Sequence, residues 1–190
     1  ERRGRRSMAR SSAPMAPRAH DSLARNAAAD PQGIAYRLLE SGQAVTWAEL
    51  EQRSRRCAAL LLARGLRTGD AVAIYLDNHL RYFEILWAAH RIGLYYTTIS
   101  RHLKTAEMLY IVQDCGAKAL FTAEAFVGDV QAFDEATRHM VGWTLEGQLP
   151  GFVDYESALA SVAGDVALPV TPEGTDFSYS SGTTGLPKGI

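Results

Sequence analysis

The sequence predicts an α/β domain built on a mostly parallel sheet. Short apolar runs that suit buried strands alternate with longer segments in which apolar residues recur every three or four positions, as on one face of a helix. Thr46 and Glu49 form a helix-capping pattern between two such segments. The composition agrees, because 47% hydrophobic and 22% charged residues over 190 positions are typical of a globular domain with a core.

The first elements are a helix at residues 20–29 and a strand at 34–39, which a turn at Ser41-Gly42-Gln43 joins to a second strand. Thr46 then caps a helix that Gly65 ends, because glycine readily adopts the left-handed conformation found just past a helix C-terminus. This helix has an apolar face and a second face that we expect to be exposed to solvent. The solvent face carries the arginines Arg53, Arg55, Arg56 and Arg64.

The rest of the chain repeats strand and helix, which predicts right-handed crossovers between parallel strands. A helix is expected at 123–138, with Phe126, Val130 and Phe133 on one face, and a short apolar piece follows near Met140 and Val141. Residues 163–174 are expected to be a linker, and residues 175–180 a single strand. The remaining predicted strands are 70–76, 94–99 and 118–122, and the remaining helices are 80–92, 106–113 and 155–162.

Charge and composition exclude several function classes. The net charge of −1 gives no reason to expect nucleic acid or an acidic membrane surface as a partner, and charged residues interrupt every candidate transmembrane segment. Cys57 and Cys115 are too few for a disulfide framework, so we interpret both as small buried hydrophobic residues. A cytoplasmic enzyme, or a piece of one, fits these features, and the sequence does not indicate an oligomeric state.

Residues 1–19 are expected to be a basic, disordered arm, and residues 20–190 to be part of one domain. The arm is rich in arginine and shows no apolar periodicity. No apolar segment of about 7–15 residues follows its arginines, so an export signal is not predicted. Contact with nucleic acid is the alternative interpretation of the arm, but a solvated tail is favoured.

The strongest functional signal is the hydroxyl- and glycine-rich run that follows Tyr179. Hydroxyl groups and backbone N–H groups suit phosphate oxygens, glycines let the backbone approach a ligand closely, and a lysine adds a point charge. The hypothesis is a loop that binds the phosphates of a nucleotide. Its candidate binding residues are Ser181, Gly182, Thr183, Thr184, Gly185 and Lys188.

Composition alone leaves a bland alternative open, because clusters of Ser, Thr, Gly and Pro most often mark flexible loops or tails. The run is also not the common P-loop, which has glycine, four residues, then glycine and lysine followed by serine or threonine. Here no hydroxyl residue follows Lys188, and Pro187 lacks a backbone donor.

The order of the residues decides between these alternatives. Residues 179–189, Tyr-Ser-Ser-Gly-Thr-Thr-Gly-Leu-Pro-Lys-Gly, resemble the signature loop of the adenylate-forming, or AMP-binding, enzymes. That superfamily includes acyl-CoA synthetases, aryl-CoA ligases, luciferases and the adenylation domains of peptide synthetases. The resemblance covers about residues 22–190, and residues 95–103 look most like bacterial fatty-acyl-CoA synthetases. Other similar segments are residues 45–50, 69–74 and 114–118.

The resemblance implies the N-terminal part of the large domain of the adenylate-forming fold, truncated at the phosphate loop. It also implies ATP, Mg²⁺ and coenzyme A as cofactor and co-substrates, and a carboxylic acid, a fatty acid in the most similar members, as substrate. Ser181, Thr183 and Thr184 would donate to phosphate oxygens, Gly182 and Gly185 would permit the turn, and Lys188 would pair with the outer phosphates. Arg101 and His102 are expected to play a structural role.

No catalytic residue and no metal ligand is expected within these residues. In the family the adenine pocket, the magnesium-binding glutamate, the ribose-binding aspartate and a catalytic lysine all lie after the loop. The chain alone is therefore expected to be inactive. Three interpretations stay open, namely the N-terminal part of a fatty-acyl-CoA synthetase, an adenylating domain that loads a carrier protein, and a non-functional truncated product.

Overall fold

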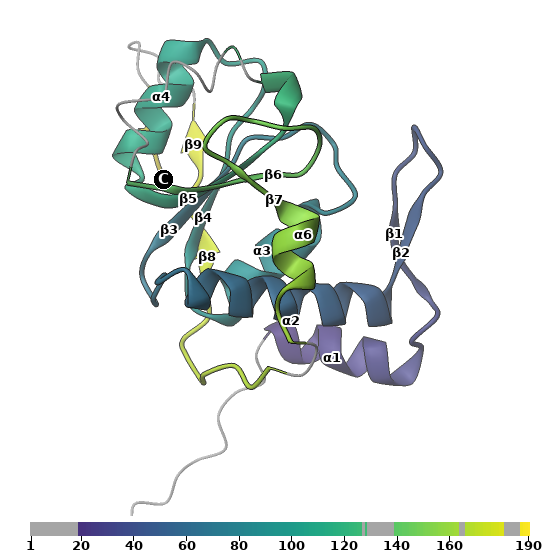
Figure 1. The fold of residues 1–190 in the computed structure, drawn as a ribbon. Coiled ribbons are helices and arrows are strands. Elements are labelled where there is room, and N and C mark those ends of the chain that lie inside the picture. The colour runs from purple at the N-terminus through teal and green to yellow at the C-terminus, as the bar shows by residue number, and fades with distance from the viewer. Residues whose placement is uncertain (1–18, 127, 129–138, 164–165, 181–186) are drawn as a thin grey trace, which may run out of the picture.

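The computed structural model describes residues 19–126, 128, 139–163, 166–180 and 187–190. Its centre is a six-stranded sheet in the order β7-β6-β5-β3-β4-β8, and neighbouring strands in it run parallel (Figure 1). The predicted α/β architecture is confirmed. The strands are β3 (Ala71–Ile74), β4 (Tyr95–Thr98), β5 (Ala117–Thr122), β6 (Val141–Thr144), β7 (Val153–Asp154) and β8 (Thr175–Asp176).

Helices cover both faces of this sheet, which is why its central strands are apolar on both sides. Val72 and Ile74 of β3 pack with the helices on one face, while Ala73 and Tyr75 belong to a separate core under α4. Figure 1 shows α1 outside α2 on the first side and α4 on the opposite side of the sheet. The helices are α1 (Ala19–Ala29), α2 (Trp47–Ala63), α3 (Tyr82–Arg91), α4 (Thr105–Asp114) and α6 (Tyr155–Ala160), with a 3₁₀ turn, η1, at Glu124–Phe126.

A separate antiparallel hairpin, β1 (Ile34–Arg37) with β2 (Ala44–Thr46), leads into α2 and projects from the body of the fold (Figure 1). The predicted cap of α2 is confirmed, since Thr46 Oγ1 accepts a hydrogen bond of 3.2 Å from the Glu49 backbone N–H. The predicted stop is confirmed too. Gly65 has a φ of +93°, a conformation that side-chain-bearing residues rarely adopt.

Several boundaries differ from the prediction. Residues 175–180 are not one strand, because β8 belongs to the parallel sheet while β9 (Tyr179–Ser180) pairs antiparallel with β10 (Lys188–Gly189). The helix predicted at 123–138 begins as the 3₁₀ turn η1, and most of it, including Val130 and Phe133, lies outside the described residues. The predicted arm lies outside them as well, apart from Ala19, with which α1 begins.

The expectation of a solvent-facing arginine row on α2 was wrong for three of its four members. Arg55 donates to the Val166 carbonyl at 3.0 Å, and Arg56 donates to the carbonyls of Ala160 and Val162. These two arginines therefore bind the segment that leads from α6 toward β8. Arg64 is exposed as predicted. The fourth, Arg53, takes part in the buried ion pair described next.

The buried carboxylate of Glu84 joins three helices. Its side chain, on α3, is 0% exposed and receives two hydrogen bonds from Arg53 of α2, at 2.6 and 2.9 Å. The hydroxyl of Tyr155, the first residue of α6, donates a third at 2.7 Å. Burial raises the pKa of Glu84, and the bonds from Arg53 and Tyr155 oppose that rise. This cluster links α2, α3 and α6 through polar contacts within an apolar core.

Candidate phosphate-binding hairpin

The strands on either side of the predicted phosphate loop lie next to each other. In the β9–β10 pairing Ser180 is opposite Lys188, and Tyr179 is opposite Gly189. Of the candidate binding residues only Lys188 is described, and it is exposed. Those outside the described residues are Ser181, Gly182, Thr183, Thr184 and Gly185.

The parallel sheet carries this hairpin through β8, which pairs with β4 at the sheet edge. The next residue, Phe177, is held at both of its backbone polar groups. Its N–H donates to the Tyr96 carbonyl at 2.9 Å, and its carbonyl accepts from Thr97 Oγ1 at 2.9 Å. Thr97 is fully buried, so a polar side chain inside the sheet is satisfied by the segment that leads into the loop.

A second attachment comes from the end of α4. The hydroxyl of Tyr179 donates to Asp114 Oδ2 at 2.7 Å, and burial together with this bond raises the pKa of Tyr179. The ring of Tyr179 meets that of Phe177 edge-on, with centroids 5.3 Å apart. Gly189 is required beside Phe177, since a Cβ on it would lie 2.8 Å from the ring. The two strands therefore pack around one aromatic residue.

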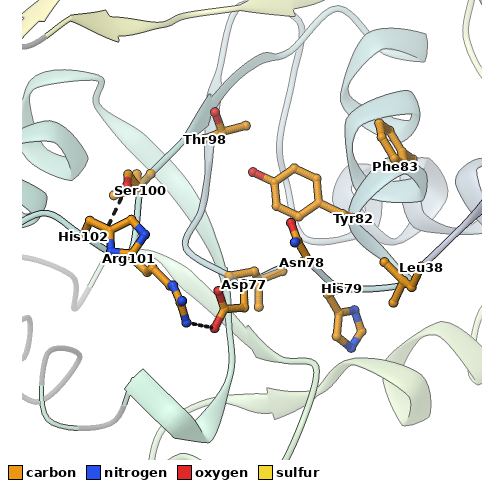
Figure 2. A pocket seen from close by; sticks show the side chains of 12 residues that line it. Leu38, Asp77, Asn78, His79, Tyr82, Phe83, Thr98, Ser100, Arg101 and His102 are labelled. Carbon is orange, nitrogen blue, oxygen red and sulfur yellow. Dashed lines mark hydrogen bonds and ion pairs between the residues drawn. The ribbon is translucent and has the colours of Figure 1, made fainter. Parts of the chain in front are cut away.

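A pocket of about 560 Å³ lies at the carboxyl ends of β3 and β4 (Figure 2). Ligands of open α/β sheets bind outside these strand ends. Thr98 and Ile99 line the pocket and directly follow Thr97, which holds Phe177. The rest of its lining is Leu38, Leu76, Asp77, Asn78, His79, Tyr82, Phe83, Ser100, Arg101 and His102.

The pocket combines apolar walls with charged groups that are paired with each other. Arg101 Nη1 lies 2.7 Å from Asp77 Oδ2, a contact visible in Figure 2 and compatible with the expected structural role of Arg101. His79 accepts from the Arg81 backbone N–H through Nδ1 at 3.0 Å, and burial lowers the pKa of His79 although Glu146 opposes this shift. A neutral imidazole suits that contact, because a protonated Nδ1 could not accept.

The described residues contain no cluster of His, Cys, Asp or Glu that could hold a metal ion. No helix in the described part of the chain is long and apolar enough to cross a membrane. Sequence reasoning found the loop but missed Thr97 as part of the site. A threonine in a strand carries no local signal of a partner that lies 80 positions away.

Comparison with known proteins decides the family. The profile of the AMP-binding enzyme family matches residues 23–190. The chain belongs to this family. It is 33% identical over 149 residues to a long-chain-fatty-acid–CoA ligase of Thermus thermophilus, a match that covers 76% of this chain and 27% of the ligase. It is 31% identical over 156 residues to the fatty acid–[acyl-carrier-protein] ligase ScoC of Streptomyces coeruleorubidus, covering 80% of this chain and 29% of ScoC.

This member of the AMP-binding enzyme family therefore spans less than a third of the length of these relatives. Among solved structures, the anthranilate CoA ligase AuaEII in complex with anthranoyl-AMP matches with a TM-score of 0.82 and 22% identity. That match covers 96% of this chain and 36% of AuaEII, and at this identity it shows the fold alone. The described sheet is thus the N-terminal portion of an adenylate-forming fold.

Proposed function

We propose that these residues are the N-terminal part of an ATP-dependent acyl-CoA synthetase whose substrate is a fatty acid. In the first step a carboxylate oxygen attacks the α-phosphorus of ATP, the bond between that phosphorus and the bridging oxygen to the β-phosphate breaks, and pyrophosphate leaves. In the second step the thiol of coenzyme A loses its proton and attacks the acyl carbonyl, and AMP leaves. The observation that carries the proposal is the pairing of Ser180 with Lys188, because it brings the two ends of the signature side by side.

In this proposal the hairpin holds the outer phosphates of ATP in line for the first step. Ser181, Thr183 and Thr184 donate to phosphate oxygens, and Lys188 neutralises charge that accumulates on the leaving pyrophosphate. Gly182 and Gly185 let the backbone approach the phosphates. Mg²⁺ adds further charge neutralisation when it is bound. The family resemblance places its ligands downstream of Ile190.

We propose further that the 190 residues alone do not form acyl-CoA. The resemblance places the adenine pocket, the ribose-binding aspartate and the catalytic lysine of the family beyond the phosphate loop. ATP–pyrophosphate exchange tests both proposals. We expect no exchange by the isolated chain and acid-dependent exchange by an enzyme that continues through the whole family region. Robust exchange by the isolated chain would overturn the claim of inactivity.

Within that longer enzyme, Lys188→Ala should lower exchange at least tenfold, because it removes a charge that contacts the leaving group. Lys118→Ala is a matched control. Lys118 is an exposed lysine that pairs with Asp70 on the surface, at 2.6 Å. Equal activities of Lys188→Ala and the control would refute the phosphate-loop assignment.

The acceptor of the acyl group has a second candidate, since the relative ScoC is named as a ligase that acts on acyl carrier protein. Offering the enzyme coenzyme A and a phosphopantetheinylated carrier protein in parallel separates the two acceptors. Thioester formation with coenzyme A supports our proposal, and formation with the carrier protein alone supports the alternative. Absence of exchange and of both thioesters in the longer enzyme would support a non-functional product.

A further inference from the structure

We propose that Thr97 and Asp114 are positioning residues for ATP, because they fix the strand from which the phosphate loop starts. Neither residue belongs to the loop, and neither is assigned a contact with ATP. Each holds the segment Phe177–Tyr179 through one hydrogen bond. The inference rests on the proposed function, since it supposes that the loop binds the phosphates of ATP.

The backbone pairing of β8 does not by itself fix the orientation of the segment Phe177–Tyr179. β8 pairs with β4 at two positions, Tyr95 with Thr175 and Tyr96 with Asp176, and the Phe177 N–H adds one backbone bond beyond them, to the Tyr96 carbonyl. A ladder this short fixes where the chain leaves the sheet, but it constrains rotation about the strand axis poorly. The segment needs further contacts if the hairpin is to keep one orientation toward a ligand.

Two hydrogen bonds from different elements supply those contacts. Thr97 Oγ1 of β4 donates to the Phe177 carbonyl at 2.9 Å, and Asp114 at the end of α4 accepts from the Tyr179 hydroxyl at 2.7 Å. Thr97 and Asp114 lie on separate elements, and they bind residues two positions apart, Phe177 and Tyr179. Each hydrogen bond therefore prevents the segment from rotating about the other. Tyr179 directly precedes Ser180, the last described residue before the loop, so this arrangement fixes where the loop starts.

The same segment also contacts β10, the strand that follows the loop. Tyr179 is opposite Gly189 in the hairpin, and Ser180 is opposite Lys188. Gly189 also packs against the Phe177 ring, which leaves no room for a side chain. A shift of Phe177 or Tyr179 would therefore move both ends of the loop together. Displacements of about 1 Å in a group that orients a substrate lower rates strongly.

The bond between Tyr179 and Asp114 contributes mainly to position and little to stability. Asp114 and Ser180 are exposed and Tyr179 is half-buried, and hydrogen bonds at such sites add little to the free energy of unfolding. Its removal should therefore change the use of ATP while the fold stays intact. That separation makes the inference testable.

The experiment measures ATP–pyrophosphate exchange by the longer enzyme that contains these residues, with the KM for ATP, the KM for the acid and the melting temperature of each variant. Tyr179→Phe and Asp114→Ala should each raise the KM for ATP about fivefold, as expected for one lost hydrogen bond, with the KM for the acid and the melting temperature unchanged. The double variant should be no worse than either single one, because both changes remove the same bond.

Conservative variants supply the rescue arm. Asp114→Asn keeps an oxygen that accepts from Tyr179 and should retain the wild-type KM for ATP. Thr97→Ser keeps the hydroxyl, whereas Thr97→Val keeps the shape and loses it, so only Thr97→Val should raise the KM for ATP. Tyr95→Phe is the matched control, since Tyr95 is 45% exposed and its ring contact with Phe177 survives the change.

Three results would overturn the inference. They are an unchanged KM for ATP in Tyr179→Phe and Asp114→Ala, effects of the two changes that add up in the double variant, and a loss of activity that follows only the melting temperature. The proposed function is checked separately by Lys188→Ala. If Lys188→Ala loses exchange while Tyr179→Phe keeps the wild-type KM for ATP, the positioning inference is refuted and the phosphate-loop assignment stands. If Lys188→Ala is also silent, the phosphate-loop assignment itself is refuted.

Discussion

Removing Arg53 should destabilise the fold strongly, because it leaves the carboxylate of Glu84 buried without its main partner. Arg53→Ala removes two hydrogen bonds to Glu84, at 2.6 and 2.9 Å, and one to Glu156, at 2.7 Å. Breaking a buried pair in this way costs about 3–5 kcal/mol. We expect the lower end, about 3 kcal/mol, because Tyr155 still donates to Glu84 and Arg81 lies 3.8 Å from it. With an m-value of about 2 kcal/mol/M, the urea midpoint falls by about 1.5 M.

Urea unfolding followed by tryptophan fluorescence measures this shift, since Trp143 is fully buried in the same core. Arg64→Ala is the matched control on the same helix. Arg64 is exposed at the end of α2, so Arg64→Ala should change the free energy of unfolding by no more than about 0.5 kcal/mol.

The pH dependence identifies the cause. Burial already raises the pKa of Glu84, and loss of Arg53 raises that pKa further. The folded protein then holds a proton at pH values where the unfolded chain has released it, so the free energy of unfolding rises as the pH falls through this window. The destabilisation of Arg53→Ala should therefore shrink between about pH 7 and pH 5. A deficit of under about 1 kcal/mol, or one that is the same at both pH values, would refute the reasoning.

Two further changes have defined outcomes. Gly174→Ala should lower the free energy of unfolding by at least about 1–3 kcal/mol, because a Cβ there would lie 2.1 Å from the Leu94 carbonyl oxygen and backbone cannot move aside easily. Gly128→Ala, whose Cβ would meet nothing within 4 Å, is the control, and equal urea midpoints would contradict the prediction. His79→Gln should flatten the loss of stability on acidification between about pH 6.5 and pH 5, since the lowered pKa of folded His79 means that the unfolded chain takes up the proton first. An unchanged slope in His79→Gln would contradict this prediction.

The sequence predicted the alternation of strands and helices because that information is local. Apolar runs, the Thr46 cap and Gly65 each act over a few residues, and each had the expected effect. Long-range partners could not be predicted in this way. Arg53 and Glu84 are 31 positions apart, and an arginine that pairs with a buried carboxylate has the same helical spacing as one that faces water.

For the candidate site too, local sequence order was predictive and long-range pairing was not. The order of residues 179–189 was sufficient to recognise the phosphate-loop signature, and the matching family profile agrees with it. The roles of Ser181 and its neighbours in binding stay predictions, since those residues lie outside the described part of the chain. The break between β8 and β9 could not be predicted, because β9 is defined by its pairing with Lys188 and Gly189 and by no propensity of its own.

The pairing of β8 with β4 has a consequence for the order in which the molecule assembles. During synthesis from the N-terminus, the strands from β3 to β7 emerge before β8, the strand that pairs with β4. Thr97 of β4 and its partner Phe177, just after β8, are 80 residues apart. A contact this distant in sequence closes a large loop, and it is made here by a two-residue strand at a sheet edge. Such an edge opens with less free energy than the core. A variant can thus keep its central sheet and lose the segment that carries the proposed phosphate loop, so melting of the core and binding of a nucleotide report on different parts of this fold.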